Sequence, residues 1–143
     1  MVAEIVEFFM APFYRVNIEQ VVAETIDEHD DDIVELNLSQ LEAGKTSEGN
    51  DIKPFYKPGT VKARKKEGLQ TDHVDFKRKG GFYAGTFAKR TTGGTEISST
   101  DPKAPFLIKR SGEGIFGLTV ANRGELENRM RPTLQDKFKQ ALL

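Results

Sequence analysis

Two stretches with helical apolar periodicity, one towards each end of the chain, flank a middle rich in glycine and proline. In the C-terminal stretch Leu126, Met130, Leu134 and Phe138 recur at four-residue intervals, which predicts one apolar stripe along a helix. The N-terminal stretch has the same kind of spacing at Ile18, Val21, Val22, Thr25, Ile26, Ile33, Val34, Leu36, Leu38 and Leu41. This order predicts helices at both ends and places any strands between them.

Each terminal helix carries signals for its start and its end. Asn17 is placed to cap the first helix, and Gly44 to stop it. The acidic run 27–32 interrupts the apolar pattern, so one irregular helix and two shorter helices both fit. Thr119 can cap the last helix, in which Pro132 predicts a kink or a restart.

The middle of the chain predicts loops and short strands. Residues 44–60 have a loop composition, and a short basic helix capped by Thr60 follows them. The segment 87–100 predicts a β-hairpin that turns at Gly93 and Gly94, and 104–110 is a candidate third strand. The apolar anchors expected before and within the hairpin are Phe82, Tyr83 and Phe87.

These elements predict an α+β fold, with a small antiparallel β-sheet packed by an N-terminal helix and a C-terminal helix. A length of 143 residues suits a single domain. We expect it to comprise an acidic helical part (1–43), a basic loop and β part (44–118) and the last helix (119–143).

Composition narrows the classes of function. The chain has no cysteine, which removes disulfides, thiol catalysis and cysteine-based zinc sites. The first 16 residues, which we call the leader, include the aromatic run "EFFMAPFYRV" (7–16) and lack the basic start and cleavage site of a signal peptide. No apolar run approaches the roughly 20 residues that span a bilayer. We therefore expect a soluble protein that is not exported by the usual route and has no membrane contact.

Charge is divided unevenly along the chain, although the net charge is only −1. Residues 1–50 carry 12 acidic and two basic side chains, whereas residues 51–143 carry 10 acidic and 19 basic ones. A division of this size bears on partners and association more than on fold. The acidic part of one copy is able to meet the basic part of the next, and the basic part is equally able to face nucleic acid.

Two glycine motifs resemble nucleotide-binding loops but lack the context that these loops need. Gly112, Gly114 and Gly117 match G-x-G-x-x-G, yet Ile115 and Phe116 lie inside the motif and the chain ends before a further βα unit. "AGKT" at 43–46 lacks the first glycine of a phosphate-binding P-loop. We therefore expect no cofactor. We interpret Gly112, Gly114 and Gly117, together with Gly81, as structural turns.

The sharpest catalytic candidate is Asp75-Phe76-Lys77, a D-x-K triplet of the kind that metal-dependent nucleases place on a strand. The carboxylate would hold Mg²⁺ and the lysine would stabilise transition-state charge, with Asp51 or Asp72 completing the site. Such triplets also arise by chance in charged sequences. The acidic run "DEHDDD" has no calcium-loop spacing and favours a solvated surface, so we predict neither a resident metal nor an enzyme.

The most persistent feature of the middle is a series of basic groups. Either a phosphate-binding surface or a surface complementary to the acidic first third explains them. They are Lys62, Arg64, Lys65, Lys66, Lys77, Arg78, Lys79, Lys89, Arg90, Lys109 and Arg110.

Several of these pieces, taken in order, resemble the tail-completion or virion-morphogenesis proteins at the head–tail junction of tailed bacteriophages. The matched loop pattern consists of Tyr56, Pro58, Thr60 and Lys62, and the matched glycine turn of Gly81, Phe82 and Thr86. "APFLIKRSG" (104–112) and "GIFGLT" (114–119) occupy the positions of the last two family motifs. The resemblance covers roughly residues 40–143, and the leader has no counterpart in it.

The resemblance implies a structural virion protein without catalysis, assembled in the host cytoplasm as a homo-oligomeric ring. Its neighbours would be portal or head-completion proteins and tail proteins, with DNA passing through the channel. Ring subunits meet through heterologous faces, which suits an acidic surface on one side and a basic surface on the other. We therefore expect most of the basic groups to face a neighbouring subunit and some to contact channel DNA.

Overall fold

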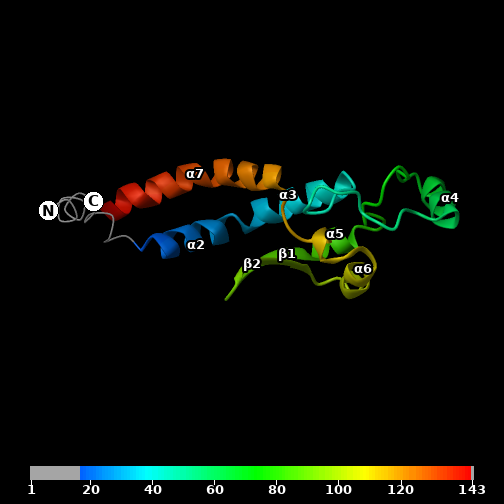
Figure 1. Cartoon of the computed structure of the whole chain (residues 1–143), viewed down its shortest axis with the longest axis horizontal. Helices are drawn as coiled ribbons and strands as arrows, with labels where there is room; N and C mark the ends of the chain where they lie inside the picture. The colour runs from blue at the N-terminus through cyan, green and yellow to red at the C-terminus, as the bar shows by residue number, and fades with distance from the viewer. Residues whose placement is uncertain (1–16, 143) are drawn as a thin grey trace.

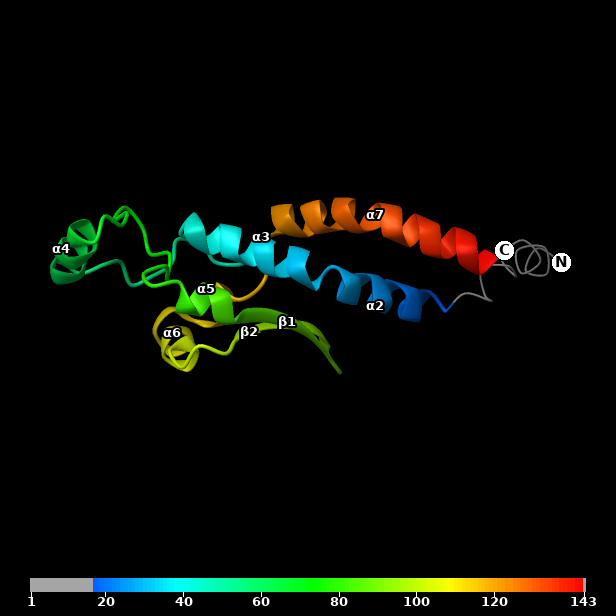
Figure 2. The same ribbon diagram turned by 180° about the vertical axis from the view of Figure 1, so that it is seen from behind.

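The computed structural model describes residues 17–142, so the predictions for the aromatic leader lie outside the described residues. The chain is elongated, with both ends of the described segment at one extremity and the short helix α4 at the other (Figures 1 and 2). The elements are α2 (Ile18–Glu28), α3 (Asp30–Glu42), α4 (Pro58–Lys66), α5 (Gly81–Gly85), β1 (Thr86–Thr91), β2 (Gly94–Ser99), α6 (Ala104–Ser111), the 3₁₀ turn η1 (Glu113–Ile115) and α7 (Val120–Leu142).

The N-terminal apolar stretch forms two helices instead of one. Asn17 caps α2 as predicted, since its Oδ1 accepts the backbone N–H of Gln20 at 3.1 Å. The break falls at His29, whose Nδ1 bonds the carbonyl of Thr25 at 2.8 Å, while the Thr25 hydroxyl donates to the Val21 carbonyl at 2.7 Å. Side chains that bond backbone carbonyls in this way compete with the helical ladder, which accounts for the interruption.

The loop after α3 begins where the sequence predicts. Gly44 has a φ of +74°, and a side chain there would lie 2.7 Å from the ring of His73. The His73 Nε2 in turn contacts the Glu42 carbonyl at the end of α3. The glycine stop therefore also brings the segment around residue 73 against the end of α3.

The C-terminal helix begins as predicted but does not break. The Thr119 hydroxyl accepts the Asn122 N–H at 3.1 Å, and α7 then runs through Pro132 without a restart. Of the two outcomes predicted for Pro132, a kink or a restart, the restart is therefore excluded. Met130 is buried, and the rest of its stripe is half-buried towards α2 and α3.

The predicted hairpin is confirmed, with its turn one residue earlier. Thr91 pairs with Gly94, so the two loop residues are Thr92 and Gly93. Within the described residues the sheet has only these two antiparallel strands. Phe82 is buried as expected, whereas Phe87 is 37% exposed and does not anchor the core.

Two further elements differ from the prediction. The segment 104–110 is a helix and not a third strand, because Ala104, Leu107 and Ile108 reach the core at helical spacing instead of alternating. Helix α4 starts at Pro58, whose fixed φ suits a first helical position, so Thr60 lies inside the helix and does not cap it.

The core consists of two small clusters along α3. One contains Leu41, Ile52, Val74, Phe82, Ala104 and Ile115, and the other contains Ile33, Leu36 and Leu118 with Leu126, Ala88 and Ile97 against them. The second cluster joins α3, the hairpin and α7. The α+β class, with an N-terminal and a C-terminal helix against a small sheet, is thereby confirmed.

The glycine-rich turn between α6 and α7 is fixed by amides on α3. Asn37 is fully buried; it donates to the Ile115 carbonyl at 3.0 Å and accepts the Gly117 N–H at 2.9 Å. Gln40 acts in the same way two residues further along, since it donates to the Gly117 carbonyl and accepts the Thr119 N–H. Ile115 and Leu118 are both buried, and of the two only Leu118 belongs to the cluster that includes Leu126 of α7.

Candidate functional site

The predicted catalytic carboxylate, Asp75, lies at the centre of a buried hydrogen-bond network. Its Oδ1 accepts the Tyr56 hydroxyl at 3.1 Å, the Arg64 guanidinium at 3.1 Å and the Lys77 N–H at 2.9 Å. Its Oδ2 accepts the Gln70 amide at 2.8 Å. Both oxygens therefore have hydrogen-bond partners within the protein itself, three at Oδ1 and one at Oδ2.

Arg64 reaches this network from α4 and is almost fully buried. Its side chain is 4% exposed, stacks on the Tyr56 ring at 4.6 Å, and also donates to the carbonyls of Gln70 and Lys77. Burial raises the pKa of Tyr56, which keeps the phenol protonated as a donor to Asp75. The network thus holds α4 against the segment 70–77.

The other members of the predicted nuclease site are not brought to Asp75. Lys77 turns to Glu42 and lies over the Tyr83 ring, Asp51 pairs with Lys45, and Asp72 is exposed. Across residues 17–142 no group of three or more histidine or acidic side chains is placed to hold a metal ion. The geometry favours a structural role for Asp75 over the nuclease interpretation.

The structure divides the predicted basic groups into two sets. Four are paired within the chain: Arg64 with Asp75, Lys77 with Glu42, Arg78 with Glu67, and Arg90 with Asp27. The remaining groups are exposed, and the described residues offer them no ion-pair partner. They are Lys62, Lys65, Lys66, Lys79, Lys89, Lys109 and Arg110.

Opposite charges gather towards opposite ends of the molecule. We define the helical arm as residues 17–43 and 120–142, which carry 12 acidic and five basic side chains. We define the basic end as residues 53–81 and 100–111, which carry 12 basic and four acidic side chains. Figures 1 and 2 show α2 and most of α7 towards one extremity and α4 at the other.

Part of the acidic excess on the arm is balanced by α7. Arg129 contacts Asp32 at 2.9 Å and Glu35 at 3.4 Å, and Lys137 contacts Glu28 at 2.7 Å. At the start of α3, partial burial raises the pKa of Asp30, and the neighbouring carboxylates Asp27 and Asp31 raise it further. Arg90, which pairs with Asp27, lowers this pKa in part, so the junction of α2 and α3 is a crowded group of carboxylates with one cation beside it.

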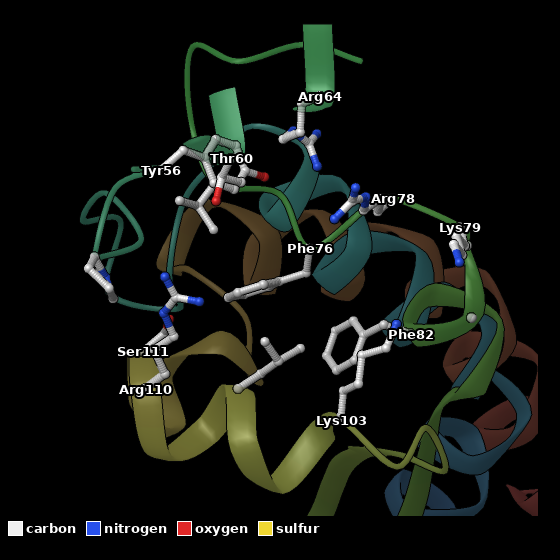
Figure 3. Close-up of a pocket in the computed structure, with 15 residues that line it drawn as sticks. Tyr56, Thr60, Arg64, Phe76, Arg78, Lys79, Phe82, Lys103, Arg110 and Ser111 are labelled. Carbon is white, nitrogen blue, oxygen red and sulfur yellow. The ribbon is translucent and has the colours of Figure 1, made fainter. Parts of the chain in front are cut away.

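The basic end contains a pocket of about 300 Å³ between α4, α5 and α6. Figure 3 shows Phe76 and Phe82 in its interior and cationic side chains around them. Its lining includes five cations and no carboxylate: Arg64, Arg78, Lys79, Lys103 and Arg110. Three of these, Lys79, Lys103 and Arg110, have no carboxylate partner among residues 17–142.

Sequence reasoning finds most of this surface but misses the pocket. Arg78, Lys79 and Arg110 belong to the predicted basic series, whereas Lys103 does not, because it stands alone between Pro102 and Ala104. The predicted strand over 104–110 would put Leu107 and Arg110 on opposite faces, so it gives no sign of a pocket. The helix observed over 104–111 puts both side chains on the face that lines the pocket. The signal in the sequence is the helical spacing of Ala104, Leu107 and Ile108.

The pocket geometry suits a ligand with negative charge beside an apolar or aromatic group.

No protein-family model, curated protein or solved structure shows a significant match to the chain. Among the helices of residues 17–142, each is too short or too polar to cross a bilayer.

Proposed function

We propose that this chain is a structural subunit of the head–tail junction of a tailed bacteriophage, acting as a ring between portal or head-completion proteins and the tail. The observation that carries the proposal is the segregation of charge towards opposite ends of an elongated subunit. Heterologous contacts between unlike faces generate a closed ring when the rotation from one subunit to the next closes. The order of loop, short helix, glycine turn and hairpin in the family resemblance adds support.

Complementary charge would act mainly on encounter and register. The helical arm of one copy would face the basic end of the next, where Lys62, Lys65 and Lys66 project from α4. Such contacts raise the association rate and exclude misaligned neighbours, while apolar contacts supply much of the affinity. Exposed apolar groups at the basic end that would supply them are Phe55 and Phe106, which are 55% and 63% exposed.

The test is the assembly state of the full chain against concentration and salt. Multi-angle light scattering and electron microscopy should show closed rings that form with increasing concentration and weaken as salt rises towards about 1 M, where the Debye length falls to about 3 Å. The triple substitution Lys62→Glu, Lys65→Glu and Lys66→Glu should suppress assembly. A matched triple, Arg123→Glu, Arg131→Glu and Lys139→Glu on α7, should not, because it makes the acidic arm more acidic. A chain that stays monomeric at high concentration and is missing from purified virions would rule the proposal out.

A basic DNA-binding accessory protein is the second candidate, and the unpaired lysines of α4 favour it. Contacts with channel DNA would use the same exposed side chains, Lys62, Lys65 and Lys66. Binding to duplex DNA should then fall with salt, with a log–log slope of about −0.9 for each phosphate neutralised. A salt-independent affinity, or none, would remove this candidate and leave the ring proposal untouched.

A further inference from the structure

The pocket at the basic end has a chemistry that selects one kind of occupant. Its interior is aromatic and aliphatic, with Phe76, Phe82 and Leu107, and Lys79, Lys103 and Arg110 supply unpaired positive charge around it. An occupant must therefore bury an apolar group and present carboxylates or phosphates beside it. A space of about 300 Å³ enclosed by three helices admits side chains but not a duplex.

The leader of the chain combines the two required properties within seven residues. Residues 4–10 read "EIVEFFM", which places Glu4 and Glu7 beside Phe8 and Phe9. The segment has two negative charges and no positive one, opposite to the pocket. Charge complementarity and aromatic content together therefore match the leader to the pocket.

The length of the leader determines whether it can enter the pocket of its own copy or only that of another copy. Phe8 is nine residues before Asn17, so an extended chain carries it about 30 Å from the start of α2. Helices α2 and α3 have 11 and 13 residues and together extend about 36 Å, because a helix rises about 1.5 Å per residue. The pocket is lined by residues of α4, α5 and α6. These helices lie beside or beyond the end of α3 that is far from α2 (Figures 1 and 2). The pocket of the same copy is therefore out of range.

We propose that residues 4–10 of one copy occupy the pocket of a neighbouring copy, with Phe8 or Phe9 against Phe76 and Phe82 and the two glutamates beside Lys103 and Arg110. The contact joins the arm extremity of one subunit to the basic end of the next. It is heterologous, so it closes a ring or extends a filament. This inference rests on the self-assembly part of the proposed function.

The absence of cysteine allows a direct crosslinking test in the full chain. Met10→Cys marks the leader while keeping both phenylalanines, and Ser111→Cys marks the pocket wall conservatively. The two single variants, one carrying a size tag, are mixed and treated with a short thiol-specific crosslinker. The expected product is a mixed dimer of one tagged and one untagged chain, and the double variant should give a ladder of multimers.

The matched control is Ser98→Cys on β2, used in place of Ser111→Cys. It is the same substitution at a position outside the pocket. It should give less mixed dimer by about tenfold. Equal yields from Ser98 and Ser111, or a double variant that crosslinks only within one chain, would overturn the proposal.

Charge reversal tests the pocket itself. Lys103→Glu with Arg110→Glu should lower the yield of mixed dimer about tenfold, and Glu4→Lys with Glu7→Lys on the partner chain should restore it. Arg123→Glu with Arg131→Glu on α7, the same charge change outside both the pocket and the basic end, should leave the yield unchanged.

Light scattering on the same samples separates this proposal from the proposed function. Rings that form without the Met10–Ser111 crosslink would overturn the leader contact and leave the ring protein standing. A chain that neither assembles nor crosslinks at high concentration would overturn both. Binding of free phosphate or nucleotide to the pocket, with no crosslink, would also overturn the leader as its occupant.

Discussion

The helical arm and the basic end of this molecule use their charges in different ways. On the arm, ion pairs lie on the surface and join helices that also pack through apolar contacts, as Arg129 does with Asp32 and Glu35. At the basic end, one ion pair is buried, Arg64 with Asp75, and most of the other cations face solvent. The difference indicates that charge at the basic end divides into one structural pair and a surface open to partners.

The largest effect should come from breaking the buried pair. Arg64→Met keeps most of the side-chain volume but leaves the Asp75 carboxylate without its cation, so we expect a loss of about 3–5 kcal/mol in the free energy of unfolding. Chemical denaturation followed by circular dichroism measures it. Lys65→Met, one residue further along α4 and exposed, is the control and should change stability little. A cost below about 1 kcal/mol for Arg64→Met would mean that Asp75 is not held by this pair.

The turn between the two regions should be the next most sensitive position. Gly117 has a φ of +128°, and a Cβ there would lie 3.0 Å from the Cβ of Ser47. Gly117→Val should therefore cost about 2–3 kcal/mol through backbone strain and overlap.

A second glycine supplies the matched control for that substitution. Gly124 lies within α7 and has open space where a Cβ would lie, so Gly124→Ala should stabilise the chain by about 0.5–1 kcal/mol. Thermal unfolding of both variants measures the contrast, and a tolerated Gly117→Val would show that the turn does not require glycine.

How far sequence reasoning reaches depends on the range of the interactions concerned. Asn17, Gly44 and Thr119 act within a few residues of themselves, and the predicted helix start, stop and cap are confirmed. The branched and aromatic residues of segment 104–110 favour a strand, although the spacing of its core contacts is helical. The pocket and the Arg64–Asp75 pair join residues 11 or more positions apart, and no local pattern reports such contacts.

On the arm, removing a cation should cost less than at the buried pair. Arg129 contacts Asp32, Glu35 and Glu125, and these acceptors raise its pKa, yet its side chain is partly open to water. Arg129→Met should therefore destabilise the chain far less than Arg64→Met, and the loss should shrink further in about 1 M salt. Arg131→Met, exposed and with no ion pair in residues 17–142, is the control. If Arg129→Met matched Arg64→Met at both salt concentrations, the contrast between surface and buried pairs would be wrong.

The smallest effect should be a gain, at the crowded carboxylates where α2 meets α3. Partial burial, with Asp27 and Asp31 beside it, raises the folded-state pKa of Asp30 above its ordinary value of 3.8. The folded chain therefore binds this proton more tightly than the unfolded chain, so ionised Asp30 opposes folding at neutral pH, and the penalty fades as pH falls through the raised pKa.

Asp30→Asn should accordingly stabilise the chain at pH 7 by about 0.5 kcal/mol, a modest gain because the side chain is partly solvated. The gain should narrow as pH falls through the raised pKa, where wild-type Asp30 takes up its proton. Urea denaturation at several pH values measures it, with Glu19→Gln in the first turn of α2 as the matched control that should give no gain. A gain that stayed constant from pH 7 to pH 4 would show that ionisation of Asp30 is not its source, and the account of the crowded carboxylates at this junction would be wrong.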